Sequence, residues 1–411
     1  MGTYARKDVA FEAGEGPWLE TATGEVFLDL TSGIAVNALG HAHPVLVKAL
    51  KDQAEKLWHT SNLFRVPGQE RLAQRLCDLT FADAVFFCNS GAEACEGAMK
   101  AARRFHAVNG QPERFKIITF AGAFHGRTFA TLSAGSNPKH LDGFGPPMDG
   151  FVNLPFGDHD ALERAARQDD VAAIMVEPIQ GEGGVRPIPV QCLEGLRALC
   201  DRRGILLIFD EVQTGVGRTG KLFAHQWTDI TPDIMAIAKG IGGGFPLGAF
   251  LTTASVGEAM SAGTHGSTFG GNPLAVAVGN ALLDVVADED FLLGVQDTSA
   301  HMLQSLCALK DEHPALIEDV RGKGLLIGLK MKCPASDLVD AAFQAKVLLV
   351  GAGDNVVRVL PPLNATAAEV SEALGRLSSA LSTLETDTTS DGAPSAEATS
   401  DQRPPTVERR T

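Results

Sequence analysis

The chain has 411 residues, of which 45% are apolar, so it can bury a large core and exceeds the usual size of one domain. The 35 Lys and Arg residues against 50 Asp and Glu residues leave a formal charge of −15, and the sequence contains no basic block. This balance argues against a protein that binds the phosphate backbone of nucleic acids.

Short runs rich in Val, Ile and Leu alternate with amphipathic stretches in the first part of the chain. These runs lie at 84–88, 116–120, 171–178, 204–210 and 233–238. Because they are continuously apolar, we expect strands buried on both faces, as in a mainly parallel sheet covered by helices. Helical spacing of apolar residues at 192–203 and an Ala-rich stretch at 91–107 predict two of these helices. The pattern indicates an α/β fold.

The sequence pattern changes after about residue 280. Helical patterns are followed by apolar runs at 322–331, 347–353 and 356–363, and a helical pattern at 367–381 closes the fold. This order predicts a smaller α+β domain. From Thr386 to Thr411 the chain is polar and almost free of large apolar residues, which predicts a disordered tail.

The cysteines are odd in number and include no C-x-x-C pair, which indicates neither a disulfide framework nor a zinc ribbon. We expect buried thiols in a reducing compartment at Cys77, Cys88, Cys95, Cys192, Cys200, Cys307 and Cys333. The amino terminus has no apolar signal region, and no apolar run reaches membrane-spanning length. The sequence therefore predicts a cytoplasmic protein without a membrane partner.

Ligands of open α/β sheets bind at the carboxyl ends of strands, so the residues that follow the apolar runs are the first candidates for a site. These residues are 89–92, 124–127, 177–184, 210–213 and Lys239. Ser90 with Glu93 three positions later matches a capping box, and the N–H groups of such a helix start favour a phosphate. A plain helix cap without a ligand is the more common use of this pattern.

Lys239 follows an apolar run and precedes glycines that permit an unusual backbone path. A lysine in a dry cleft loses its proton more easily and becomes a nucleophile suited to Schiff-base formation. A lone lysine at a strand end is more often a surface charge, and a lone Asp210 is more often a solvated acid or a cap. A helix start that can bind a phosphate (89–92), an acid (Asp210) and a nucleophilic lysine (Lys239) are together what pyridoxal 5′-phosphate (PLP) requires.

Nine segments carry a resemblance to a known family: SGIAVNALGHAHP (32–44), HTSNLF (59–64), NSGAEACEGAMKAAR (89–103), FHGRT (124–128), EPIQGEGG (177–184), FDEVQTGVGRTGK (209–221), AKGIGGGFPLGA (238–249), HGSTFGGNP (265–273) and VVRVLPPL (356–363). In this order they resemble the class III, or ornithine-type, PLP-dependent aminotransferases, over nearly all of residues 10–380. The resemblance implies fold type I of the PLP-dependent transferases, with a mainly parallel seven-stranded sheet in the large domain. The implied boundaries are an N-terminal segment joining the small domain (1–45), a large PLP-binding domain (46–280), a small domain (281–385) and the tail (386–411). It also implies a homodimer with a shared active site and no metal.

The resemblance implies a role for each residue around the cofactor. Lys239 would hold PLP as a Schiff base and later move a proton between the substrate and cofactor carbons. Asp210 would pair with the ring nitrogen and keep the ring an electron sink. Gln213 would bond to the ring hydroxyl, Phe124 would stack on the ring, and Val212 would also contact the cofactor.

Small residues and hydroxyls would hold the phosphate by the same resemblance. Gly91 and Ala92 would donate backbone N–H groups, joined by Thr268 of the partner subunit in a dimer. Ser267 would touch the substrate.

The resemblance assigns the substrate carboxylates to two arginines, whose planar forks suit carboxylates. Arg127 would bind the α-carboxylate of the amino donor and the distal carboxylate of glutamate. Arg358 would take the α-carboxylate of glutamate. Glu182 would pair with Arg358 while the amino donor is bound and swing away when glutamate or 2-oxoglutarate arrives.

The segment around Ile34 resembles enzymes of the family that act on N-acetylornithine, whereas ornithine enzymes carry a tyrosine near this position. Ile34 supplies no hydrogen bond, which disfavours free ornithine and GABA. The implied reaction moves the ω-amino group of N-acetylornithine to 2-oxoglutarate, giving N-acetylglutamate semialdehyde and glutamate in arginine biosynthesis. N-Succinylornithine, N-succinyldiaminopimelate and a carrier-bound lysine precursor stay open as donors. A non-catalytic PLP-binding regulator is the other class of function, although the chain keeps the lysine, the acid and both arginines.

Two further patterns have simpler interpretations. Residues 215–221 (GVGRTGK) match part of a P-loop, but Leu222 stands where Ser or Thr is required, so we expect a glycine-rich loop. His41 and His43 have no third ligand nearby, which favours packed or capping groups over a metal site.

Overall fold

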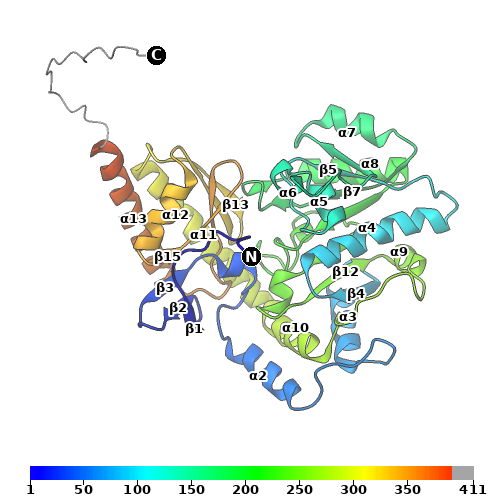
Figure 1. Ribbon diagram of the computed structural model, residues 1–411, viewed down its shortest axis with the longest axis horizontal. Helices are drawn as coiled ribbons and strands as arrows, with labels where there is room; N and C mark the ends of the chain where they lie inside the picture. Colours follow the sequence, from blue (N-terminus) through cyan, green and yellow to red (C-terminus); the bar gives the residue numbers. More distant parts are fainter. Residues whose placement is uncertain (391–411) are drawn as a thin grey trace, which may run out of the picture.

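The computed structural model describes residues 1–390 and consists of a larger and a smaller body (Figure 1). The larger body is built on a seven-stranded sheet in the order β4-β12-β11-β10-β7-β5-β6. Its strands are β4 (Ala84–Cys88), β5 (Lys116–Phe120), β6 (Phe151–Leu154), β7 (Val171–Val176), β10 (Leu206–Asp210), β11 (Ile234–Ile237) and β12 (Gly248–Thr252). Six of these strands run in the same direction, and β12, which lies between β4 and β11, runs opposite to them. The predicted mainly parallel, seven-stranded α/β fold is confirmed.

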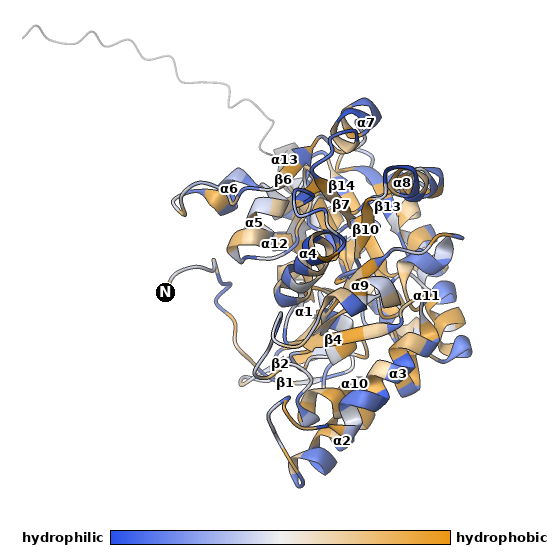
Figure 2. Ribbon diagram, turned by 90° about the vertical axis from the view of Figure 1, so that its right-hand side faces the viewer, coloured by the Kyte–Doolittle hydropathy of each residue, from blue (hydrophilic) through white to orange (hydrophobic). Residues whose placement is uncertain are grey.

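Helices cover both faces of this sheet, and the central strands β7, β10 and β11 are buried along their whole length. The main elements around it are α2 (Pro44–Ala54), α3 (Pro67–Leu79), α4 (Gly91–Val108), α5 (Phe129–Gly135), α6 (Pro138–Leu141), α7 (His159–Ala166), α8 (Val190–Arg203), α9 (Ala254–Ala259) and α10 (Pro273–Val286). Figure 2 shows the strands largely in orange and the outer sides of α7 and α8 in blue. This distribution is the one expected when apolar strands are covered on both faces.

The smaller body contains both ends of the described chain. One of its sheets has the order β13-β14-β17-β16, and the other has the order β1-β2-β3-β15. The elements are β1 (Phe11–Glu15), β2 (Trp18–Thr21), β3 (Val26–Asp29), α11 (Glu289–Glu312), β13 (Ile317–Lys323), β14 (Leu326–Met331), α12 (Ala335–Gln344), β15 (Val347–Leu348), β16 (Val350–Ala352), β17 (Val356–Val359) and α13 (Ala367–Ser390). Because β3 pairs with β15, the amino-terminal strands are part of this body.

The structure corrects three expectations from the sequence. The run at 322–331 is not one continuous strand, because it contains the end of β13, a turn at Gly324 with a φ of +63°, and β14. Helix α13 continues to Ser390, so residues 386–390 are helical and not the start of a disordered tail; residues 391–411 lie outside the described residues. Of the seven cysteines, all free, only Cys88, Cys95 and Cys200 are buried.

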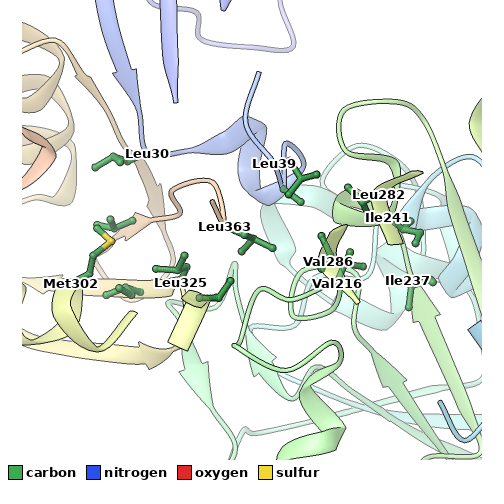
Figure 3. Close-up of a cluster of buried hydrophobic side chains, with 14 of the residues drawn as sticks. Leu30, Leu39, Val216, Ile237, Ile241, Leu282, Val286, Met302, Leu325 and Leu363 are labelled. Carbon is green, nitrogen blue, oxygen red and sulfur yellow. The ribbon is translucent and has the colours of Figure 1, made fainter. Parts of the chain in front are cut away.

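One apolar core joins the two bodies. Figure 3 shows Val216, Ile237 and Ile241 of the larger body in the same cluster as Leu325 and Leu363 of the smaller one, with Leu282 and Val286 of α10 beside them. The connection is reinforced by Arg218, which is buried and donates to the carbonyl oxygens of Leu325 (3.1 Å) and Pro361 (2.6 Å). The P-loop-like segment thus contributes an arginine that ties the two bodies together.

The histidines near the amino terminus have different surroundings. His41 Nε2 lies 2.9 Å from Asp29 Oδ2, whereas the side chain of His43 makes no capping bond although it precedes α2.

Among the described residues, no helix combines the length and the apolar character needed to cross a membrane.

Candidate active site

The carboxyl ends of β4, β5, β7, β10 and β11 open into one cavity of about 450 Å³. These ends coincide because β4 runs antiparallel to β12, which in turn runs antiparallel to β11. The cavity is lined by Val36, Asn89, Ser90, Gly91, Ala92, Phe124, His125, Gly126, Arg127, Glu177, Glu182, Asp210, Val212, Gln213, Ala238, Lys239, Gly244, Phe245, Pro246 and Leu247. Most of the residues expected from the sequence thus face one space.

The amino terminus of α4 forms one wall of the cavity. Ser90 Oγ accepts a hydrogen bond from Glu93 N (3.2 Å), and the Glu93 carboxylate accepts one from Asn89 N (2.7 Å). The first helical bond runs from Ala94 N to Ser90 O, so the N–H groups of Gly91 and Ala92 precede the hydrogen-bonded helix. A β-carbon at position 91 would lie 2.8 Å from Val212 Cγ1, so glycine lets Val212 pack closely against this helix start. The unbonded N–H groups of a helix start favour an anion.

Lys239 begins a short 3₁₀ helix, η2 (Lys239–Gly242), directly after β11. Its backbone has a φ of +47°, which is the left-handed region that residues with a β-carbon rarely adopt. The side chain reaches solvent only in part, through the cavity, and protein atoms surround its amino group. This burial, with the charge of Arg358 nearby, lowers the pKa of Lys239 to about 8, although Glu182 and Asp210 act in the opposite direction.

The lowered pKa of Lys239 predicts how fast the apoprotein attaches PLP. An ordinary lysine is uncharged in only about 1 of 250 molecules at pH 8, whereas a lysine with a pKa of about 8 is half uncharged there. We expect the attachment rate, followed by cofactor absorbance, to rise with pH and reach half its maximum near the pKa of about 8. Nα-Acetyl-lysine measured in parallel corrects for the titration of PLP itself, and a midpoint at the ordinary value of about 10.4 would contradict the prediction.

Asp210, at the end of β10, lies in a buried hydrogen-bond network. Its Oδ2 atom is 2.7 Å from His125 Nδ1 and 3.3 Å from Cys95 Sγ, and its Oδ1 atom accepts a bond from Val212 N (3.0 Å). Burial alone would lower the pKa of His125, but the hydrogen bond and the charge of Asp210 outweigh it and raise the pKa. The network therefore fixes the position of the Asp210 side chain, whose carboxylate can pair with a protonated ring nitrogen.

The same three side chains have the composition of a metal site, since their ligand atoms all lie within 4.8 Å of one another. A metal ion would need Cys95 as a thiolate. Burial and the neighbouring charge of Asp210 raise the pKa of this thiol well above its ordinary value, so Cys95 keeps its proton. The geometry favours a hydrogen-bond network at this position.

Glu177, directly after β7, is a functional candidate to which the resemblance assigned no role. Its carboxylate accepts bonds from the backbone N–H groups of Phe124 (2.9 Å) and Gly181 (3.2 Å). It thereby holds together the residue expected to stack on the cofactor ring and the loop that carries Glu182. Burial and the charge of Asp210 raise the pKa of Glu177 to about 7. The signal in the sequence was a single acid directly after a fully apolar strand.

Arg358 reaches this site from β17 in the smaller body. Only 1% of the residue is exposed, and its Nη1 atom lies 2.6 Å from Glu182 Oε1 and 3.4 Å from Gln213 Oε1. Its Nη2 atom donates to the carbonyl oxygen of Gly351 (3.1 Å). Glu182 has a side chain that is 33% exposed, so it can leave the pair more easily than Arg358 can.

Arg127 lies at the other side of the cavity and is exposed. Its guanidinium carbon is 5.6 Å from the centre of the Phe124 ring, and its Nη2 atom is 3.0 Å from His140 Nε2. Within residues 1–390, the cavity lining does not include the chain's own Ser267 or Thr268. Ser267 Oγ accepts bonds from Asn89 Nδ2 (3.2 Å) and Gly270 N (3.0 Å), and Thr268 is exposed.

A lysine whose amine titrates near neutral pH, set beside a buried carboxylate and a helix start open to an anion, suits a phosphorylated aldehyde cofactor. On a mainly parallel sheet with a second, smaller body, this cavity is that of a PLP-dependent transferase. More narrowly, the chain belongs to the class III aminotransferases, because the family model described as Aminotransferase class-III matches residues 3–381.

Comparisons with individual proteins agree with this family. The acetylornithine aminotransferase of Mesorhizobium japonicum is 59% identical over 375 residues, which cover 91% of this chain and 94% of the relative. The crystal structure of the N-acetylornithine aminotransferase from Stenotrophomonas maltophilia is 39% identical, with a TM-score of 0.83 over 93% of this chain and 98% of that one. The ornithine aminotransferase from Toxoplasma gondii is 32% identical, with a TM-score of 0.90 over 94% of this chain and 93% of that one. The protein is an aminotransferase, and the cofactor of its family is PLP.

Proposed function

We propose that this aminotransferase moves the ω-amino group of N-acetylornithine to 2-oxoglutarate, forming N-acetylglutamate semialdehyde and glutamate in arginine biosynthesis. The observation that carries the proposal is the ion pair between Glu182 and the buried Arg358. This pair would occupy the carboxylate-binding site at Arg358, and the remaining donors of Arg127 would bind the single carboxylate of an acylated diamine. The acetylornithine aminotransferase that is 59% identical supports the same donor.

The cofactor, when bound, supplies an electron-accepting ring that stabilises negative charge at the substrate carbon. Lys239 would hold it through its amino group. The Asp210 carboxylate, positioned by its hydrogen bond with His125, would pair with the ring nitrogen. Gln213 would bond to the ring hydroxyl, and Phe124, whose backbone Glu177 fixes, would cover the ring face.

The phosphate would lie at the start of α4, against the N–H groups of Gly91 and Ala92, with Val212 packed behind Gly91. The Lys239 amine would also take the proton from the substrate carbon and return it to the cofactor carbon. A pKa of about 8 suits both directions of this transfer near neutral pH.

The two arginines would divide the carboxylates between the two half-reactions. Arg127 would bind the α-carboxylate of N-acetylornithine and later the distal carboxylate of glutamate. Arg358 would bind the α-carboxylate of glutamate or 2-oxoglutarate once Glu182 has moved away. Glu182 thus acts as an internal carboxylate that substitutes for the missing second one of the amino donor.

Replacing Glu182 by alanine should change the preference between the two amino donors. We expect kcat/KM for glutamate to rise relative to N-acetylornithine by at least about tenfold, because a hydrogen bond to a charged group is worth about 1.5–3 kcal/mol. Half-reactions monitored by absorbance give the two values separately. Glu182→Gln keeps the shape of the side chain and removes its charge, so it is the matched control. Unchanged selectivity in both variants would contradict the proposed movement of Glu182 away from Arg358.

The first test of the function is the visible spectrum of the PLP-loaded protein during addition of amines. The band of the lysine-bound cofactor should bleach with N-acetylornithine and return when 2-oxoglutarate is added. N-Succinylornithine, ornithine and GABA are added in parallel. If one of these amines bleaches the band and N-acetylornithine does not, the aminotransferase activity is supported but the proposed amino donor is wrong.

The proposal includes a cytoplasmic homodimer with a shared active site. Leu63, Phe64 and Phe269 are 89%, 68% and 60% exposed, and Asn62 joins their two loops through bonds to the carbonyl oxygens of Ser267 and Gly270 (both 3.0 Å). This apolar surface adjoins Asn89 beside the phosphate seat. A second copy bound here would place Thr268 of the partner subunit near the phosphate. Sedimentation equilibrium should give twice the mass of one chain, and a monomer at working concentration would overturn this part.

A further inference from the structure

His140 is the partner that the structure gives to the exposed Arg127. Its Nε2 atom lies 3.0 Å from Arg127 Nη2. A guanidinium has donors only, so Nε2 must accept this hydrogen bond with its lone pair. The ring proton is then on Nδ1, and His140 is neutral. Burial and the charge of Arg127 lower the pKa of His140, which keeps this neutral form at working pH although Glu182 acts in the opposite direction.

The position of His140 is fixed by the short helix α6. Asn137 caps this helix, accepting a bond from Lys139 N (3.0 Å), and Asp142 N bonds to the carbonyl oxygen of Pro138 (3.0 Å). The His140 ring also meets Phe124 edge to face, with centroids 6.1 Å apart and planes at 90°. Phe124 and His140 therefore contact the guanidinium of Arg127 from two directions and reduce the number of rotamers that the arginine can adopt.

Figure 1 shows α6 on the side of the larger body that faces the smaller one. Here His140 lines a second cavity of about 600 Å³ together with Arg186 and Asp354. Phe124 and Glu182 line both this cavity and the main one. His140 thus stands at the border of the two cavities, beside the place where the far end of a bound substrate would lie.

We propose that His140 is a positioning residue that orients Arg127 for the carboxylate at the far end of the substrate. The bond to His140 uses one N–H of Nη2 and leaves the other donors of Arg127 for the carboxylate. The inference deepens the proposed function, because it rests on Arg127 binding that carboxylate. It applies to both half-reactions, since the amino donor and glutamate would each present a carboxylate to Arg127.

Binding of glutarate to the PLP-loaded enzyme tests the proposal without catalysis. Glutarate is a five-carbon dicarboxylate that carries neither the amine nor the keto group. We expect His140→Phe to raise its calorimetric Kd by about fivefold, the effect of losing one ordinary hydrogen bond. His140→Gln, which places an amide oxygen near the position of Nε2, should restore most of the affinity. His140→Leu is a second variant without an acceptor if His140→Phe does not fold.

An Arg127→Lys background separates the inference from the function on which it depends. If His140 acts through Arg127, His140→Phe should have no further effect on glutarate binding in that background. An unchanged Kd in His140→Phe, with a higher Kd in Arg127→Lys, would overturn the role of His140 alone. An unchanged Kd in Arg127→Lys would overturn the proposed role of Arg127.

Steady-state kinetics supply a second readout that a loss of folding would not reproduce. His140→Phe should raise KM for N-acetylornithine and glutamate and leave kcat within about twofold, because the orientation of Arg127 affects carboxylate binding. In the absence of 2-oxoglutarate, the half-reaction with 1,5-diaminopentane, an ω-amine without a carboxylate, should have the same rate in both enzymes. An equal loss with this diamine would show that His140 does not act on carboxylate recognition.

Discussion

Lys239→Ala should lower the rate of both half-reactions by about 10⁴-fold, the upper range for one residue that transfers protons. The side chain is the amine at the end of β11, and burial already brings its pKa to about 8. Stopped-flow absorbance of PLP-loaded protein mixed with N-acetylornithine measures the rate. The start of α4 and Asp210 are unchanged, so the variant should still bind PLP noncovalently.

Two controls make this prediction specific to the amine. Lys239→Arg keeps a positive charge but supplies no amine that titrates near neutral pH, so it should be as inactive as Lys239→Ala. Added methylamine should partly restore proton transfer in Lys239→Ala, because the vacated space opens to the main cavity. A Lys239→Ala enzyme with more than about one hundredth of normal activity would contradict the assignment.

Asp210→Asn should have the second largest effect, because the amide cannot satisfy the network around it. With its oxygen bonded to Val212 N, the amide NH₂ group would face the donors of His125 and Cys95. Breaking a buried charge pair costs about 3–5 kcal/mol, so we expect PLP affinity to fall by about 10²- to 5 × 10³-fold and the half-reaction rate to fall with it. Fluorescence titration of the apoprotein with PLP measures the affinity.

Cys95→Ala is the matched control for Asp210→Asn. The thiol is a weak donor to the same Oδ2 atom, so its removal should change PLP affinity by no more than about threefold. His125→Asn removes the stronger donor and should give an intermediate loss. If Asp210→Asn changes PLP affinity no more than Cys95→Ala does, the Asp210 carboxylate does not pair with the ring nitrogen.

The strands of the large sheet differ in how far the sequence predicts them. The runs at 84–88 and 116–120 coincide with β4 and β5, because most of their residues are apolar and all of them are buried or half-buried. Strand β12 was missed since it begins with Gly248 shortly after a glycine-rich turn, and the edge strand β6 is short and contains Asn153. Most of β13 falls outside the apolar run at 322–331, because Ile317–Lys323 consists mainly of charged and exposed or half-buried residues.

In the candidate site, some residues can be predicted from a local sequence pattern, whereas others are brought together only by tertiary contacts. Lys239 and Asp210 directly follow apolar strands, so the rule for strand ends was enough to find them. His125 and Cys95 acquire their roles only because β5 and α4 approach the end of β10, which no local spacing reveals. His140 meets Arg127 through the path of the chain after α5, so only the folded structure brings the two together.

The left-handed backbone at Lys239 has a consequence for selection. A residue with a β-carbon in this conformation costs about 1–3 kcal/mol, and glycine would adopt it freely. The chain has a lysine here although glycine would give the more stable fold. The reactive amine at position 239 therefore lowers the free energy of unfolding. A thermostability screen without an activity assay would therefore enrich variants that have lost the reactive amine. Stabilised forms of this enzyme need both traits selected together.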